Sequence, residues 1–229
     1  MKLAIDIIAA AQAMNARGIN SGTSGNVSAR TQTGMLITPS AMDYEQLTPD
    51  DIVAMDFDTT WFATSNLRPS SEWRFHLDIY ANRPDVHAVV HCHSTYATAL
   101  AVHGRDIGSF HYMVAVAGGH DIRCAPYATF GSQELSDNAV KALEGRSACL
   151  LAHHGMIAVG EHLAGALKLA VQVEELARQY LAACALGEPP VLTRAQIEQV
   201  VAKMSAIGYG SSPGFIDEDP GAKVLHLDR

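Results

Sequence analysis

Two histidines separated by a single residue, His91 and His93, follow a short run of valines and offer the clearest chemistry in the sequence. The run predicts a buried β-strand, and side chains two residues apart on a strand point to the same side. Two neutral imidazoles buried there without a shared partner would leave their hydrogen-bonding capacity unused. A divalent metal ion removes that difficulty, because a His-x-His pair supplies two nitrogen ligands from one rigid element. We therefore interpret the pair as metal ligands.

A second histidine pair, His153 and His154, ends an apolar stretch that starts at Ala148 and is predicted to be a strand. A catalytic zinc usually has three protein ligands and an open position for substrate. Adjacent strand residues face opposite sides, so only one of the two should reach the metal, and the pattern does not choose between them. Cys92, inside the first pair, is expected to face away as a small buried apolar residue.

Glu72 is the candidate acid–base group. It stands at the start of a predicted helix that begins after Pro69 and ends before Pro84. The helix dipole stabilises a carboxylate in the first turn, and a carboxylate beside a Lewis-acidic ion can move a carbon-bound proton. His76, one turn further on, is interpreted as a residue packed on the helix surface.

The elements that must position these groups alternate between helices and strands. Apolar periodicity and capping residues predict helices over residues 2–17, 72–80, 95–102, 132–143, 162–186 and 193–208, and strands over 34–38, 52–57, 86–93, 148–153 and 156–159. The mixture predicts a single α/β domain, residues 1–209, layered around a mixed sheet. The Gly/Pro/Asp-rich segment 210–229 is expected to be a partly mobile tail.

Composition excludes several classes of protein. Only 17% of the 229 residues are charged and the formal net charge is −8, which argues against a nucleic-acid partner. The four cysteines are scattered without a CxxC spacing, as in a protein of a reducing compartment. The apolar N-terminus lacks the regions of a signal peptide, and no apolar run is long enough for a membrane span. We expect a cytoplasmic protein with no membrane partner.

Several motifs, in order, resemble those of the class II sugar-phosphate aldolases, a family that also includes ribulose-phosphate 4-epimerases. The fuculose-1-phosphate aldolases are the most similar group. The resemblance covers about residues 3–209. The segments that carry it are Pro69–His76, Val89–His93, His111–Met113, Cys124–Gly131 and His153–Gly155.

The resemblance implies a three-layer α/β/α sandwich with a mixed, mostly antiparallel central sheet. It implies a Zn²⁺ cofactor, replaceable by Mn²⁺ or Co²⁺, and a homotetramer with active sites between subunits. Matched by position, the metal ligands are His91, His93 and His154. Glu72 matches the catalytic carboxylate, and Tyr112 matches a tyrosine that reaches the site of a neighbouring subunit.

The resemblance also implies the residues that bind substrate. Three phosphate-binding loops correspond to Gly25-Asn26, Ser40-Ala41 and Ser70-Ser71, and Phe130 and Tyr209 match the aldehyde end of the pocket. Serines at a helix start, with free backbone N–H groups, favour an anion on physical grounds as well. Ala41 is a departure, because glycine is usual there and a methyl group makes close approach of phosphate less assured.

The predicted reaction is reversible cleavage of a ketose 1-phosphate to dihydroxyacetone phosphate and an aldehyde. Candidate substrates are L-fuculose 1-phosphate, 5-deoxyribulose 1-phosphate and 5-methylthioribulose 1-phosphate. Alternatives that use the same metal site are a sugar-phosphate 4-epimerase and a decarboxylase or dehydratase acting on a phosphorylated sugar derivative. A fourth alternative is a non-catalytic interaction head, as in cytoskeletal proteins of this fold, but such heads lack the metal histidines.

Overall fold

The computed structural model describes residues 1–209. These residues form an eight-stranded sheet in the order β4-β3-β2-β1-β5-β8-β7-β6. Every neighbouring pair is antiparallel except β6 and β7, which are parallel. The predicted mixed, mostly antiparallel sheet is therefore confirmed. The strands are β1 Asn26–Arg30, β2 Gly34–Ile37, β3 Val53–Asp56, β4 Trp61–Phe62, β5 Ala88–Cys92, β6 Arg123–Ala125, β7 Ala148–Leu151 and β8 Gly155–Gly160.

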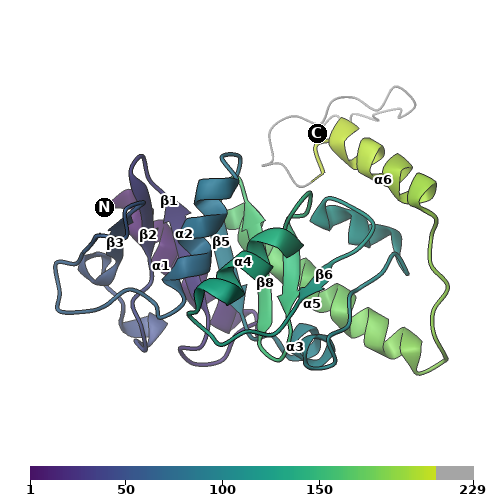
Figure 1. The fold of residues 1–229 in the computed structure, drawn as a ribbon, viewed down its shortest axis with the longest axis horizontal. Coiled ribbons are helices and arrows are strands. Elements are labelled where there is room, and N and C mark those ends of the chain that lie inside the picture. Colours follow the sequence, from purple (N-terminus) through teal and green to yellow (C-terminus); the bar gives the residue numbers. More distant parts are fainter. Residues whose placement is uncertain (210–229) are drawn as a thin grey trace, which may run out of the picture.

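Helices cover both faces of the sheet and give the predicted three layers (Figure 1). One face carries α1, α3 and α5, and the other carries α2 and α4. The α-helices are α1 Lys2–Ala16, α2 Trp73–Asn82, α3 Thr95–Val102, α4 Gln133–Ala142, α5 Leu163–Cys184 and α6 Arg194–Ala206, and the 3₁₀ helices are η1 Tyr44–Gln46, η2 Pro49–Asp51 and η3 Tyr112–Ala117. The tail expected at 210–229 lies outside the described residues.

None of the helices formed by residues 1–209 combines the length and the apolar character needed to cross a lipid bilayer.

Successive side chains of β5 point to opposite faces of the sheet and pack into two different hydrophobic cores. Val90 and Cys92 pack into the core under α1, α3 and α5, whereas Val89 packs into the core under α2 and α4. His91 lies on the α2 side, with its ring 5.4 Å from that of Phe75. The prediction that Cys92 faces away from its histidine neighbours is confirmed, and burial raises the pKa of its thiol to about 12.

Three predicted boundaries near the candidate site were wrong. The strand expected to end at His93 ends at Cys92, so that His93 is the first residue beyond it. The strand expected over 148–153 ends at Leu151, and a turn carries both histidines of the second pair. Helix α2 begins at Trp73, which places Glu72 at the N-cap rather than in the first turn. The site is thus built from the ends of elements, where backbone direction changes and side-chain periodicity no longer predicts orientation.

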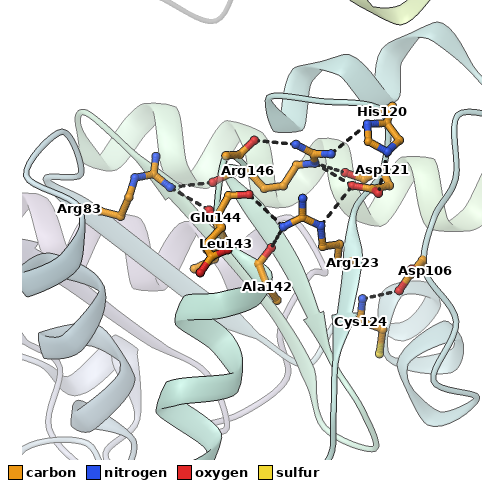
Figure 2. A network of polar contacts seen from close by, with 11 residues as sticks. Arg83, Asp106, His120, Asp121, Arg123, Cys124, Ala142, Leu143, Glu144 and Arg146 are labelled. Atoms are coloured by element: carbon orange, nitrogen blue, oxygen red, sulfur yellow. Dashed lines mark hydrogen bonds and ion pairs between the residues drawn. The ribbon is translucent and has the colours of Figure 1, made fainter. Parts of the chain in front are cut away.

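A cluster of charged, mostly half-buried side chains holds the far end of α4 to the sheet (Figure 2). We call Arg83, Arg123, Arg146 and Asp121 the arginine network. Arg83 and Arg123 donate to four main-chain carbonyls at and after the end of α4, at 2.9–3.2 Å. Arg146, 8% exposed, donates through Nε to Asp121 Oδ1 at 2.7 Å. These bonds satisfy carbonyls that a helix end leaves without partners.

Candidate metal centre and active site

Four side chains converge at one end of the sheet. Nε2 of His91 lies 3.0 Å from Nε2 of His93 and 3.1 Å from Oε2 of Glu72. Nε2 of His154 lies 3.1 Å from the other oxygen of the same carboxylate, Oε1. All four potential ligand atoms lie within 4.8 Å of one another. The structure therefore brings together the three predicted metal ligands and the predicted catalytic carboxylate, and we call this set the metal cluster.

The chemistry of these donors fits a divalent cation. Nδ1 of His91 lies 2.9 Å from the carbonyl oxygen of Met156, an acceptor, so the neutral tautomer that fits this contact has its proton on Nδ1. In that tautomer Nε2 of His91 carries a lone pair and no proton. It faces Oε2 of Glu72, with which it cannot form a hydrogen bond. Oε1 of Glu72 is buried and has no hydrogen-bond partner. A cation among these atoms would give each lone pair a partner, and the His91 contact to a carbonyl is the orienting bond that metal-binding histidines usually make.

Burial and neighbouring charge set the protonation states. Desolvation, with the charges of His91 and His154, lowers the pKa of His93 to about 4, so its ring is neutral at pH 7. Burial alone would raise the pKa of Glu72, but in the metal-free site positive charge on the facing His91 and His154 holds it well below its usual range. A neutral imidazole and an ionised carboxylate are the forms that bind metal.

The turn after β7 decides which histidine of the second pair joins the cluster. His153 has a left-handed backbone, with φ of 55°, and is exposed, with its ring 5.9 Å from that of Tyr127. His154 turns inward instead. A Cβ atom at Gly155 would lie 2.6 Å from the Cys92 carbonyl oxygen and 2.8 Å from Cδ2 of His93. Only glycine at this position lets the turn approach the end of β5 closely enough for His154 to meet the first pair.

Two of the three predicted phosphate loops lie side by side. An isolated antiparallel bridge joins Pro39 to Pro69. The backbone N–H of Ser40 donates to the Arg68 carbonyl at 3.0 Å, next to that bridge. The loops Ser40-Ala41 and Ser70-Ser71 thereby border one cavity of about 430 Å³. Its lining residues are Thr23, Ser24, Ser40, Ala41, Ser71, Glu72, His93, Tyr127, Ala128, Phe130, His153 and His154.

The third loop lies against the metal strand. A Cβ atom at Gly25 would lie 2.6 Å from the carbonyl oxygen of His91, so glycine is required for this approach. Asn26 pairs in register with His91, and its Nδ2 donates to Oε2 of Glu72 at 3.0 Å. Asn26 and Ser70 are buried and do not line the cavity; Oγ of Ser70 accepts from the Glu72 backbone N–H at 3.3 Å. Phosphate contacts by these two residues stay predictions.

Ala41 occupies a strained position in the cavity wall. Its φ is 57°, in the left-handed region where a Cβ atom costs about 1–2 kcal/mol. The residue that departs from the family pattern therefore departs at a position where the backbone itself favours glycine.

The two predicted tyrosines lie away from the cavity of their own chain. Tyr112 and Tyr209, 50% and 44% exposed, border a separate cavity beside α6. Phe130, by contrast, lines the metal-cluster cavity and is 65% exposed. Within one chain, the structure thus joins Phe130 to the candidate site and leaves Tyr112 and Tyr209 exposed on another surface.

The sequence analysis missed several residues of the site. Thr23, Ser24 and Tyr127 line the cavity, and the first two extend the Gly/Ser-rich segment in which only Gly25-Asn26 was singled out. His76 is wholly buried, as its interpretation as a packed helix residue expected, but its contact with Asn26 was not predicted. The spacing of Glu72, His76 and Tyr80, four residues apart on one helix, was the available signal.

Comparison with known proteins agrees with this fold. Residues 5–181 match the family model described as Class II Aldolase and Adducin N-terminal domain. The chain is 53% identical over 202 residues to a 5-methylthioribulose-1-phosphate/5-deoxyribulose-1-phosphate aldolase of Rhodospirillum rubrum, covering 88% of this chain and 90% of that protein. It is 48% identical over 208 residues to an L-fuculose phosphate aldolase of Escherichia coli, covering 90% and 96%.

A solved structure of an L-fuculose 1-phosphate aldolase superposes with a TM-score of 0.86 at 39% identity, covering 89% of this chain and 96% of that one. Fold and metal cluster define a class II aldolase architecture. The chain belongs to the class II aldolase and adducin N-terminal domain family.

Proposed function

We propose that this protein is a metal-dependent aldolase that reversibly cleaves a ketose 1-phosphate to dihydroxyacetone phosphate and an aldehyde. The observation that carries the proposal is the metal cluster, which opens on a cavity bordered by two serine-containing loops. The relatives named as aldolases of methylthioribulose, deoxyribulose and fuculose phosphates support the same reaction.

His91, His93 and His154 would hold the metal, for which zinc is our proposal. A divalent ion there would polarise the substrate carbonyl and favour the negative charge that develops on its oxygen as the C3–C4 bond breaks. No lysine Schiff base is then required.

The protein's own residues bind substrate and move protons. Ser40 and Ser71 offer hydroxyls to the phosphate group from the cavity wall. In the cleavage direction, Tyr112 of a neighbouring subunit accepts the proton of the C4 hydroxyl, which becomes the aldehyde oxygen. Glu72, a carboxylate in the resting site, first takes a proton from the substrate's C3 hydroxyl and delivers it to C3 after the bond has broken, and the proton that left the C4 hydroxyl replaces it on the product's hydroxyl. The buried position of Glu72 keeps bulk water from competing for that proton.

An apolar aldehyde fragment fits the lining. Tyr127, Ala128 and Phe130 contribute apolar surface to the same cavity as the serines. We propose that the fragment is short and deoxygenated at its end, as in 5-deoxyribulose 1-phosphate, 5-methylthioribulose 1-phosphate or L-fuculose 1-phosphate.

We further propose a homotetramer in which Tyr112 and Tyr209 complete the cavity of a neighbour. Their exposure beside α6, away from the cavity of their own chain, supports this arrangement. The four unpaired cysteines support a reducing, cytoplasmic location.

The test is a panel of ketose 1-phosphates, with release of dihydroxyacetone phosphate coupled to a reporter enzyme. Substrates are ranked by kcat/KM before and after the metal is removed with a chelator and restored. We expect turnover of at least one 5-deoxy or 5-methylthio substrate that is lost with the metal and regained with it. Epimerisation of a sugar phosphate without net release of dihydroxyacetone phosphate would contradict the proposal.

A further inference from the structure

We propose that a buried chain of side chains, Tyr80, Ser28, His76 and Asn26, positions the carboxylate of Glu72, with His76 as its central positioning residue. We call it the relay. The inference deepens the proposed function, on which it rests, because it concerns the group that moves the substrate proton.

The relay is continuous and its distances are short. The Tyr80 hydroxyl lies 2.8 Å from Oγ of Ser28, which lies 2.7 Å from Nδ1 of His76. Nε2 of His76 lies 2.5 Å from Oδ1 of Asn26, and Nδ2 of Asn26 lies 3.0 Å from Oε2 of Glu72. The chain thus runs from Tyr80 in α2, across β1, and back to Glu72 at the N-cap of α2.

The direction of every hydrogen bond is fixed by the carboxylate at its end. An ionised carboxylate only accepts, so Asn26 presents its NH₂ group to Glu72 and its carbonyl oxygen to His76. His76 must then carry its proton on Nε2, which leaves Nδ1 to accept from the Ser28 hydroxyl. Ser28 in turn accepts from Tyr80. All four donors point toward Glu72, an arrangement in which successive bonds strengthen one another.

Two elements supply the relay through simple periodicities. Glu72, His76 and Tyr80 are four residues apart and form one stripe of α2. Asn26 and Ser28 are two residues apart and share one face of β1. Asn26, Ser28 and His76 are each at most 2% exposed, so water does not replace any of these bonds.

Burial of so many polar groups in a hydrophobic layer needs a reason other than stability. His76 stacks on Phe75, with ring centroids 4.6 Å apart, within the core under α2 and α4. Apolar side chains of similar size would pack there without desolvating polar groups. A chain whose donors share one direction and end on the candidate acid–base group instead fixes which way each oxygen of Glu72 points. The bond from Asn26 holds Oε2, which also faces His91, and thereby turns Oε1 toward His154.

The first test needs no substitution and no turnover. In ¹⁵N NMR spectra of wild-type protein with labelled histidine, His76 should be neutral, with its proton on Nε2 and a bare Nδ1. An Nδ1–H tautomer would overturn the proposal, because the Asn26 carbonyl would then face a nitrogen without a proton.

The second test is a matched pair of variants. His76→Gln retains an N–H donor near the place of Nε2, whereas His76→Asn is too short to reach Asn26. We expect His76→Asn to lower kcat about 10- to 100-fold, as misplacement of a catalytic group does, with KM and bound metal unchanged. His76→Gln should recover most of the loss. His103→Asn, at an exposed position after α3, is the control and should leave kcat unchanged.

The outcomes separate this inference from the proposed function. Wild-type protein that cleaves no ketose 1-phosphate defeats the proposed function, whatever the tautomer of His76. Wild-type turnover with equal kcat in His76→Asn and His76→Gln defeats the relay alone. A His76→Asn variant that fails to fold leaves the decision to the NMR measurement on wild-type protein.

Discussion

The arginine network and the metal cluster are both polar and at least partly buried, but their partners are arranged in opposite ways. In the arginine network each guanidinium faces carbonyl or carboxylate oxygens, so donors meet acceptors throughout (Figure 2). In the metal cluster a carboxylate and three imidazole nitrogens face one another, and Oε1 of Glu72 has no hydrogen-bond partner. A polar cluster that is complete in itself stabilises the fold, whereas one that is incomplete without a cation indicates a binding site.

Removing a ligand from the metal cluster should have the largest effect. His91→Asn removes a nitrogen from the centre of the cluster and should lower kcat/KM about 10⁴-fold, because metal ions contribute several kcal/mol to such reactions. Elemental analysis should find less than one metal per chain. The thermal midpoint of the metal-free variant should match that of metal-free wild type. A variant that loses both its folded structure and its activity would contradict the distinction between a binding cluster and a stabilising one.

Replacing the carboxylate of Glu72 by a neutral amide should leave the metal bound and lower turnover strongly. Glu72→Gln keeps the shape of the side chain and the three histidines, so zinc should remain bound. We expect kcat to fall about 10³-fold, within the range that general acid–base groups contribute. Unchanged turnover in the zinc-loaded variant would remove Glu72 from the mechanism.

Breaking the arginine network should show the opposite pattern. Arg146→Met leaves Asp121 with fewer partners and should lower the free energy of unfolding by about 3 kcal/mol, the scale for breaking a buried ion pair. For a chain of this size that corresponds to a fall in the melting temperature of about 6–12 °C. At a temperature where the variant is folded, kcat should equal that of wild type. Loss of kcat in the folded variant would mean that the two clusters are coupled.

The pH dependence of the free energy of unfolding should report on His76, the central residue of the relay. Full burial, assisted by the charge of His91, lowers the pKa of His76 to about 3 from an ordinary 6.5. The unfolded chain therefore binds a proton between pH 6.5 and about 3 that the folded protein does not. The contribution of His76 to the free energy of unfolding is therefore fully present above pH 6.5. It is lost as the pH falls below that value, by about 1.4 kcal/mol per pH unit.

Urea unfolding of metal-free protein at pH 7, 6 and 5 measures that slope. His76→Gln should flatten the dependence by about one proton relative to wild type. His103→Gln, at an exposed site, is the control. Parallel curves for wild type and His76→Gln would show that His76 is not held neutral.

Ala41→Gly should have the smallest effect. Removal of the Cβ atom relieves the positive φ of 57° and should raise the free energy of unfolding by about 1 kcal/mol. The extra space at the phosphate loop should lower KM modestly. Ala97→Gly, inside α3 and buried, is the matched control and should destabilise the protein instead.

Local sequence patterns predicted the helices and strands better than the turns that connect them. The bounds of α3, the Ser132 and Thr193 caps and the opposed faces of His91 and Cys92 follow from residue chemistry and periodicity. The choice of His154 over His153 does not, because it depends on a left-handed turn fitted against β5 by Gly155.

Contacts between residues far apart in the sequence were the second feature that the sequence did not predict. The role of His76 depends on Asn26 and Ser28, which lie about 50 residues earlier and meet α2 only when β1 takes its place in the sheet. Tyr112 and Tyr209 are a further case, because the site proposed for them belongs to another copy of the chain.

A single titration tests the central claim most directly: Zn²⁺ is added to metal-free protein while turnover of a ketose 1-phosphate and the zinc X-ray absorption spectrum are followed together. We predict that turnover rises linearly to one Zn²⁺ per chain. The spectrum should show three imidazole nitrogens at about 2.0–2.1 Å and no sulfur. Full turnover before any zinc is added, or a zinc ion bound through cysteine sulfur, would contradict the account.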